Sequence, residues 1–508
     1  MFSETDSSTK ILAIGHDVIQ ATRPRGVIAP LQIGLAIQLH HHFGSRFLID
    51  TLYNLGFSPS YTEVQRFEMN PAVSRNTEAV ADDNHTFVQY VADNVDHNIK
   101  SLDRYGTFHG MGIIAASTPD TKTKRVVSRL NPTIGEINSL AKIYIRFYKE
   151  QSNAFRTLRF EILEQREIAN ESWKIDLLSK VCWPLKFNGS WSTIMHKLDG
   201  SYPGKSKITF LPMIDLNPSD ESCIYTTLHF ISKEAIKNNC TTILTFDQLM
   251  YWKTMVILQN EPIGSPLKSF ILKLGGFHTQ MSFIGGIGYL MSGSGLANLL
   301  ETVYASTAVS HMMSGKALAR AVIGHFLVDT ALTALILSLV YGIPVPKFES
   351  NPDENDDKSI RNNDSTDDLH TRQIDIPEIR YPKELEDATD ILNLILKGEV
   401  SLSDINNSDA LSAIRTNIEH FRQSRSKCRT ANLWFQYMDM ICILRDFIKA
   451  ERTGNWNMHL KSLKSMLPYF AASGHNLYVK SAWIYINQME HLKEQKTEVA
   501  AFSKLDTM

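Results

Sequence analysis

The chain has 508 residues, of which 43% are hydrophobic and 21% charged, a composition that indicates a globular protein of two or three domains and excludes a fibrous or mainly disordered one. Its 52 Lys and Arg residues against 54 Asp and Glu residues give a net charge of −2, which excludes a global basic field for nucleic acid. Five cysteines without CxxC spacing, and a polar N-terminus without an apolar segment, predict a nuclear or cytoplasmic protein with no signal peptide, disulfide framework or zinc motif.

Residues 1–80 are expected to form a helical N-terminal region. Its three predicted helices are Leu31–His42, Ser45–Leu55 and Tyr61–Met69. Ser60 and Glu63 have the spacing of a capping box at the start of the third helix. The run His40-His41-His42 predicts no metal site, because consecutive helical side chains point about 100° apart.

Residues 81–346 are expected to form an α/β core. The predicted strands are Thr86–Ala92, Phe108–Ala116, a third at Arg125–Leu130 that completes a meander, Lys207–Ile214, Thr242–Phe246 and Phe270–Leu274. Residues 137–180 have a helical pattern. The interval between the first and the later strands is longer than the fold needs, so we expect a large insertion at about residues 119–241.

The remaining segments are predicted from charge and hydropathy. Ala317–Tyr341 is long enough to cross a membrane, but Arg320, His325 and Asp329 inside it favour a buried core helix and no membrane partner. Residues 349–368 hold eight acids against two bases, which predicts a disordered acidic linker over about 347–380. Residues 381–508 are expected to be helical. Two stretches lean basic, 121–170 and 415–430, and both are typical of solvated faces.

Acidic residues directly follow two predicted strands. Asp93 and Asp96 follow the first strand, and Asp247 follows Thr242–Phe246. A charge at the end of a buried strand is costly unless it is paired or bound to a cation, although Asp is also an ordinary turn residue. After Asp247 come a helix, a strand, the run Gly275 to His278, and a further helix that carries Glu301.

Asp93 (or Asp96), Asp247 and Glu301 therefore stand in the order of a DDE active site on an RNase H-like sheet. Such a site holds two Mg²⁺ (or Mn²⁺) ions that assist phosphodiester cleavage, and hard cations prefer several carboxylate ligands. Asp329 is the alternative to Glu301, unless an ion pair with a neighbouring helix accounts for it. The glycines of Gly285-Gly286-Ile287-Gly288 lack the GxxxxGK[ST] pattern of a phosphate loop and indicate close helix packing instead.

Two resemblances extend this interpretation. The order of Asp247, helix, strand and His278 resembles Mutator-like transposases, with Gly275 where that family has Cys or Asp, and the resemblance implies that His278 lies near the catalytic acids. The interval of 154 residues from Asp93 to Asp247 is longer than the plain fold needs. Nearly the whole chain resembles a group of uncharacterised invertebrate proteins that look derived from mobile elements, through 21–25, 28–35, 40–47, the Asp93 run, 108–114 and 245–248.

The sequence thus predicts an α/β protein with an RNase H-like mixed sheet, a large insertion and helical ends. The expected function is Mg²⁺-dependent DNA cleavage and strand transfer, with DNA and a second copy of the chain as partners. Two alternatives stay open. The first alternative is a catalytically inactive nuclear scaffold that binds nucleic acid or protein through its helical C-terminal region. The second is an α/β enzyme of unrelated chemistry.

Overall fold

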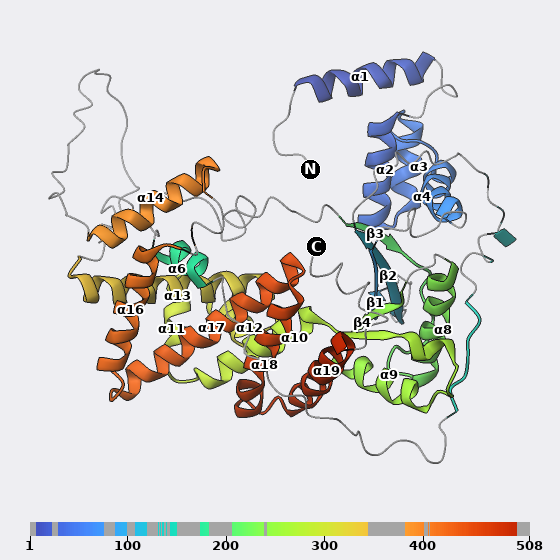
Figure 1. The fold of residues 1–508 in the computed structure, drawn as a ribbon. Helices are drawn as coiled ribbons and strands as arrows, with labels where there is room; N and C mark the ends of the chain where they lie inside the picture. The colour runs from blue at the N-terminus through green and yellow to red at the C-terminus, as the bar shows by residue number, and fades with distance from the viewer. Residues whose placement is uncertain are drawn as a thin grey trace, which may run out of the picture. The chain divides into compact units, whose positions relative to one another are not determined.

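The computed structural model describes residues 7–22, 29–75, 87–98, 107–118, 143–149, 173–181, 206–237, 241–343, 382–400 and 407–494, with a few single residues between them (Figure 1). The chain forms two compact units. The sheet unit comprises Met1–Leu158 and Gly204–Gly275, and the helical unit comprises Arg159–Pro203 and Gly276–Met508. The predicted acidic linker, 347–380, lies outside the described residues, and the division between the units falls within the predicted core, at Gly275.

A five-stranded mixed sheet organises the first unit. Its strands are β1 (Phe87–Asn98), β2 (Thr107–Thr118), β3 (Lys207–Phe210), β4 (Ile243–Phe246) and β5 (Ile271–Leu274). The order across the sheet is β3-β2-β1-β4-β5. β1 pairs antiparallel with β2, and β2 with β3, whereas β1 pairs parallel with β4, and β4 with β5. The prediction of a mixed α/β protein is confirmed.

The sequence of each strand matches its place in the sheet. All four residues of β4 are buried, as expected for a continuous apolar run in a central parallel strand. In β1 the alternate residues Val88, Tyr90 and Ala92 are buried and their neighbours are only partly covered, because successive side chains point to opposite faces. β1 therefore has one core face and one partly accessible face.

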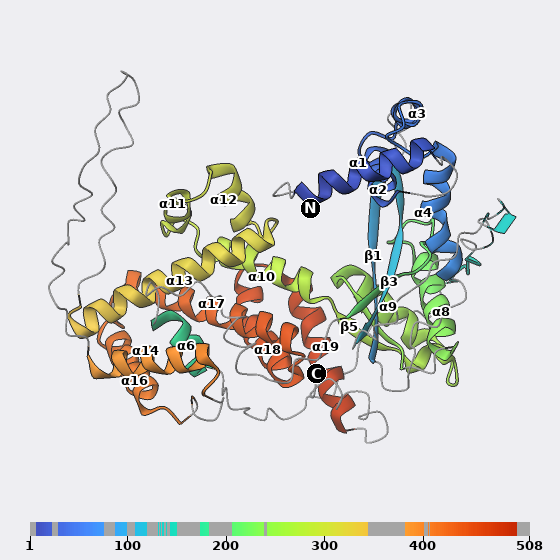
Figure 2. The same cartoon turned by 90° about the horizontal axis from the view of Figure 1, so that it is seen from above.

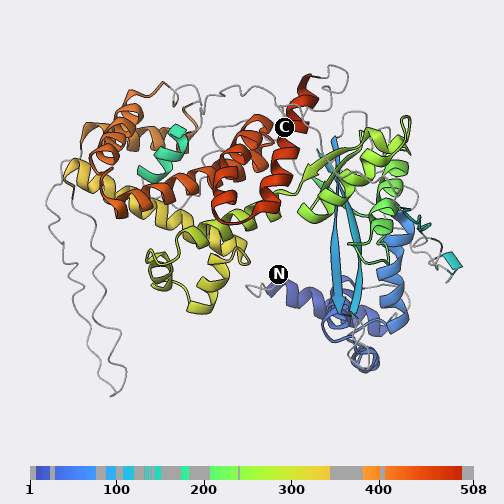
Figure 3. The same ribbon diagram turned by 90° about the horizontal axis from the view of Figure 1, so that it is seen from below.

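The β1–β2 hairpin is longer than its neighbours. Both strands have 12 residues, yet β4 pairs only with residues 89–91 of β1, and β3 only with residues 114–117 of β2. Figure 3 shows the two strands running past the rest of the sheet toward the N-terminal helices. Gly112 permits this close pairing, because a Cβ there would lie 2.4 Å from Val95 Cγ2.

Helices complete the sheet unit. They are α1 (Ser7–Thr22), α2 (Pro30–Phe43), α3 (Arg46–Asn54), α4 (Tyr61–Arg75), α8 (Glu221–Lys237), α9 (Gln248–Asn260) and the 3-10 turn η1 (Pro266–Ser269). α2, α3 and α4 confirm the three helices predicted after residue 30. α8 and α9 pack against each other beside the sheet (Figure 2).

The segment before α8 corrects one sequence prediction. Residues 143–149, expected to be helical, have no helical structure. Their backbone is held instead by α8, since Arg146 N donates to Thr226 Oγ1 at 2.9 Å and Tyr148 N donates to Ser222 Oγ at 3.2 Å. The predicted third strand at 125–130 lies outside the described residues. The strand that pairs with β2 is β3, so the predicted insertion at 119–241 contains part of the sheet.

The second unit is built of helices in its described part. They are α6 (Trp173–Val181), α10 (Gly276–Leu290), α11 (Leu296–Glu301), α12 (Ser306–Met313), α13 (Leu318–Tyr341), α14 (Lys383–Lys397), α16 (Asp409–Ser424), α17 (Arg429–Thr453), α18 (Trp456–Ala472) and α19 (Asn476–Glu494). α6 comes from the interval between β2 and β3, yet Ile175 and Leu178 share a core with α13, α14 and α16.

α13 is the helix predicted from Ala317–Tyr341. It is the one described helix that is long and apolar enough to cross a membrane, with a mean hydropathy of 1.9 over its most apolar window. It contacts α6, α10, α12, α16 and α17. Its His325 and Asp329 have no exposed surface. These contacts support the prediction of a core helix.

The glycine run in α10 serves close packing. A Cβ at Gly288 would lie 2.0 Å from the Met313 carbonyl oxygen of α12, and a Cβ at Gly286 would lie 2.8 Å from Ser473 Oγ. The packing interpretation of this run is confirmed, because neighbouring chain fills the space that side chains would need.

Candidate functional site: Asp93, Asp247 and a buried charge network

The register of β1 and β4 brings two of the predicted acids to one level of the sheet. Val91 pairs with Thr245 in the last parallel pair of these strands. Asp93 and Asp247 each lie two residues further along. Asp247 directly follows β4, whereas Asp93 lies within β1, because this strand continues to Asn98 and does not end at Ala92 as the sequence predicted. They are therefore neighbours across the sheet although 154 residues separate them in the chain.

Both acids lie on the same, partly accessible face. Gln89 Nε2 donates to Thr245 Oγ1 at 2.7 Å, so these two side chains share a face of the sheet. Asp93 is four residues after Gln89 and Asp247 is two after Thr245, and side chains alternate with a period of two. Both carboxylates therefore stand at the same end of this face.

Local hydrogen bonds orient the two carboxylates. Asp93 Oδ1 accepts from the backbone nitrogen of Asn94 at 2.8 Å. Asp247 is the N-cap of α9, where its Oδ1 accepts from the backbone nitrogen of Met250 at 2.8 Å. Asp247 thus has a structural role of its own, because an N-cap oxygen satisfies a helix donor that has no partner within the helix.

Asp96 is directed away from these acids. It lies three residues after Asp93 on a strand that continues to Asn98, so the two side chains point to opposite faces. Asp96 Oδ1 lies 2.7 Å from His109 Nδ1 on β2, and both side chains are more than half exposed. The strand therefore does not bring Asp93 and Asp96 together as ligands of one ion.

The other two predicted site residues belong to the helical unit. Glu301 is exposed at the end of α11, and its Oε1 accepts from Ser306 Oγ at 2.7 Å. His278 is partly buried in the first turn of α10, with its ring edge-on to Phe277. Among the described residues, no three His, Cys, Asp or Glu side chains gather closely enough to hold a metal ion.

A carboxylate that the sequence analysis did not consider lies at the start of α10. A Cβ on Gly276 would lie 2.5 Å from Glu451 Oε2. Glu451 Oε1 lies 2.6 Å from Nδ1 of His459, whose ring stacks on Trp456 and whose Nε2 is 3.3 Å from the Tyr485 hydroxyl. His459 is almost fully buried. Glu451 and His459 are eight residues apart, at the end of α17 and the start of α18, and this spacing matches no motif.

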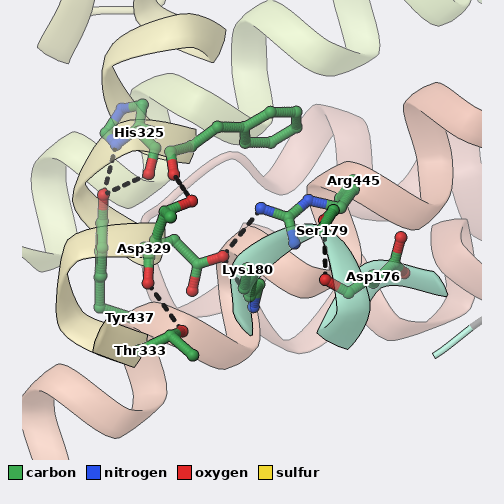
Figure 4. A network of polar contacts seen from close by, with 10 residues as sticks. Asp176, Ser179, Lys180, His325, Asp329, Thr333, Tyr437 and Arg445 are labelled. Atoms are coloured by element: carbon green, nitrogen blue, oxygen red, sulfur yellow. Dashed lines mark hydrogen bonds and ion pairs between the residues drawn. The ribbon is translucent and has the colours of Figure 1, made fainter. Parts of the chain in front are cut away.

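Asp329 is the centre of a buried ion network (Figure 4). Its Oδ2 lies 2.9 Å from an Arg445 nitrogen on α17 and 2.8 Å from Lys180 Nζ on α6. Thr333 Oγ1 donates to the Asp329 carbonyl at 2.9 Å. An ion pair with neighbouring helices therefore accounts for Asp329, and this favours Glu301 over Asp329 among the predicted acids.

The network continues along α17. Asp176 of α6 lies 3.9 Å from Lys449 Nζ, and both side chains are about 5% exposed or less. Burial, with a further contribution from Asp176, raises the pKa of Asp446 to about 7. Burial also lowers the pKa of Lys449, against the opposing effect of Asp176 and Asp446. Three acids and three cations, including Lys180 and Arg445, thus share the interior of this unit.

A buried histidine borders the network. His325 Nδ1 lies 3.0 Å from the Tyr437 hydroxyl, as Figure 4 shows. Burial lowers the pKa of His325 to about 4 and raises that of Tyr437 well above its ordinary value. Both groups are therefore neutral at neutral pH, and the charges of the network reside on its Asp, Lys and Arg members.

The chain thus combines a mixed sheet that carries Asp93 and Asp247 with a helical unit that has a charged core. Residues 188–507 match the model of a domain of unknown function, DUF8702. This match covers more than half of the chain, so the protein belongs to the DUF8702 family. No curated protein and no solved structure matches the chain.

Proposed function

We propose that this protein derives from a DDE transposase of a mobile element and acts on DNA by metal-assisted phosphodiester cleavage and strand transfer. The observation that carries the proposal is the register of β1 and β4, which aligns Asp93 with Asp247 on one face of the sheet. Carboxylates on one face of adjacent strands are typical ligands of a divalent cation, which stabilises the charged form of both, so this arrangement supports a metal site.

The topology of the sheet supports an RNase H-like core. Such a core has three antiparallel strands followed by two parallel ones on the other side of the first strand. The order β3-β2-β1-β4-β5, with β1 parallel to β4 and β4 parallel to β5, has this form. In that fold the first acid lies on the first strand and the second at the end of the fourth, which are the positions of Asp93 and Asp247 here.

The residues present fit a divalent cation in part. Mg²⁺ is usually bound by one or two carboxylates together with water and substrate phosphates, which suits Asp93 and Asp247. A bound Mg²⁺ or Mn²⁺ would activate the attacking oxygen and stabilise the leaving oxygen of the phosphodiester. Asp93 would hold the ion from the rigid β1–β2 hairpin, and Asp247 would hold it from the capped start of α9.

The third carboxylate of the proposed site is Glu301, as the order of acids in the sequence predicts. Glu301→Gln is therefore included in the test, and we expect it to reduce cleavage.

The test is nicking of labelled DNA by the purified full chain with Mg²⁺ or Mn²⁺. We expect Asp93→Asn and Asp247→Asn to abolish cleavage, with Asn chosen because it can still accept the N-cap hydrogen bond. Asp96→Asn is the matched control, since Asp96 lies on the same strand and points to the opposite face. If Asp93→Asn and Asp247→Asn cleave as fast as Asp96→Asn and the parent, the proposal is contradicted, because cleavage would then not need the aligned pair.

A non-catalytic DNA-binding descendant is the second candidate. The observation that favours it is the lack of a third ligand beside the two acids in the described part of the chain. Binding of DNA without cleavage, by the parent protein and across several DNA forms, would support this candidate. Such a protein would act in the nucleus or wherever intracellular DNA is accessible, with a second copy as a further proposed partner.

A further inference from the structure

The turn between α16 and α17 is rigid and exposed. Its backbone is fixed by hydrogen bonds from Ser426 N to the Gln423 oxygen at 3.1 Å and from Cys428 N to the Arg425 oxygen at 2.9 Å. The Asn432 side chain also donates to the Ser426 oxygen. Every residue from 423 to 430 is exposed. This turn therefore presents its side chains from a fixed backbone.

The turn is strongly positive. Arg425, Lys427 and Arg429 alternate with small residues, and no acid occurs in the sequence from 420 to 438. In the described part of the chain, no ion pair joins any of the three to a carboxylate. The other two cations of the basic stretch are neutralised, because Arg415 pairs with Glu419 and Arg422 pairs with Asp439.

We propose that Arg425, Lys427 and Arg429 form a contact surface for the phosphate backbone of double-stranded DNA. The proposal deepens the proposed function, since it names a surface that would hold the DNA substrate. Three exposed cations within five residues give this turn a high local density of positive charge, and each strand of DNA carries one negative charge per about 3.4 Å of helix axis. Backbone contacts of this kind position a protein on DNA without reading its sequence.

The composition of the turn favours nucleic acid over an anionic membrane surface. Stable attachment to a membrane usually combines cations with apolar side chains that enter the bilayer. The residues between the three cations are Ser426 and Cys428, with Ser424 and Thr430 outside them, and none is large and apolar. The cations therefore lack the apolar partners that a membrane would need.

Affinity of the full chain for a labelled random duplex, measured by fluorescence anisotropy at several salt concentrations without divalent metal, tests the proposal. The variant carries R425Q, K427Q and R429Q together. Each lost phosphate contact should reduce the slope of log affinity against log salt by about 0.9, or about 2.7 for three contacts. Between about 50 and 200 mM salt, the parent should lose roughly 40-fold more affinity than the variant.

A matched control separates the turn from net charge. K397Q, R452Q and K480Q together remove three other exposed cations of the helical unit. The control should keep the slope of the parent. An equal change in both triple variants, or no change in either, would overturn the proposal. A turn variant that keeps its DNA affinity but no longer sediments with phosphatidylserine vesicles would also overturn it, in favour of a membrane contact.

The outcome is independent of catalysis. DNA binding is measured without divalent metal, so the affinity and the salt slope do not depend on cleavage. Loss of the slope in the turn variant together with absence of nicking by the parent would support the contact surface and contradict the nuclease. Nicking that depends on Asp93, together with an unchanged salt slope in the turn variant, would support the nuclease and contradict the contact surface.

Discussion

Asp329 has no exposed surface, and two cations compensate its charge. Replacement of Arg445 by Met would leave the carboxylate with Lys180 alone in the interior of the helical unit. Removal of one partner from a buried ion pair typically costs about 3–5 kcal/mol, because the remaining charge is left uncompensated. Urea denaturation of Arg445→Met, followed by circular dichroism, should show a loss of this size.

Arg46 provides the control for this substitution. It pairs with Asp50 one turn away at 3.1 Å, and its side chain is 72% exposed. An exposed pair contributes about 0–1 kcal/mol, so Arg46→Met should unfold almost as the parent does. A loss in Arg445→Met no larger than that in Arg46→Met would show that the buried network adds little to stability.

Asp446 should make the stability of the helical unit depend on pH. Its folded pKa of about 7 lies above the ordinary value of a carboxyl group, so the folded state holds a proton that the unfolded state releases. The stability that this proton provides is complete below about pH 4 and is lost as the pH rises to about 7. The parent protein should therefore weaken over this range.

Asp446→Asn tests this dependence, because the amide resembles the protonated carboxyl group. We expect the variant to match the parent below about pH 4 and to exceed its free energy of unfolding by ~1–4 kcal/mol near pH 8. His325, with its pKa lowered to about 4, acts in the opposite direction as the pH falls below 6.5, but it does so equally in both proteins. A difference that does not vary with pH would contradict the prediction.

At the scale of elements, Asp247 couples helix α9 to the proposed site. Asp247→Ala removes the N-cap acceptor for Met250 and should cost about 0.5–2 kcal/mol, whereas Asp247→Asn should keep most of the stability. Thermal unfolding of the two variants, beside their nicking activity, separates the two roles. If Ala and Asn destabilise equally, the cap hydrogen bond contributes nothing, and activity can be compared directly.

The elements of the sheet could be predicted well where one local pattern decides. β4 and β5 follow apolar runs of the right length, and α2 to α4 follow helical periodicity and turn residues. Residues 143–149 have the same apolar spacing as a helix, but Ser222 and Thr226 of α8 accept their backbone donors. These contacts join residues 80 and 74 positions apart, so no local window contains them.

At the scale of the whole molecule, the site could be predicted only as an order of acids. The sequence identifies Asp93 and Asp247 as acids that follow apolar runs, and the parallel register of β1 and β4 aligns them, although β1 continues past Asp93 to Asn98. The sequence predicts an ion pair of Asp329 with a neighbouring helix but not the partner residues, because Lys180 and Arg445 are 149 and 116 residues away in the chain. Glu451 and His459 are only eight residues apart, but they carry no motif, and the turn from α17 into α18 brings their side chains together.

The chain order also conceals that α6 belongs to the helical unit. Leu178 lies between β2 and β3 in sequence, yet it is fully buried with residues of α13, α14 and α16. A buried Leu→Ala substitution costs about 2–5 kcal/mol, because it leaves a cavity. In hydrogen–deuterium exchange of the full chain, Leu178→Ala should speed exchange in α13, α14 and α16 and leave β1 and β4 protected. Leu244→Ala, at an equally buried position in β4, should speed exchange in the strands and leave these helices protected. If Leu178→Ala speeds exchange in β1 and β4 instead, α6 belongs with the strands that flank it in sequence.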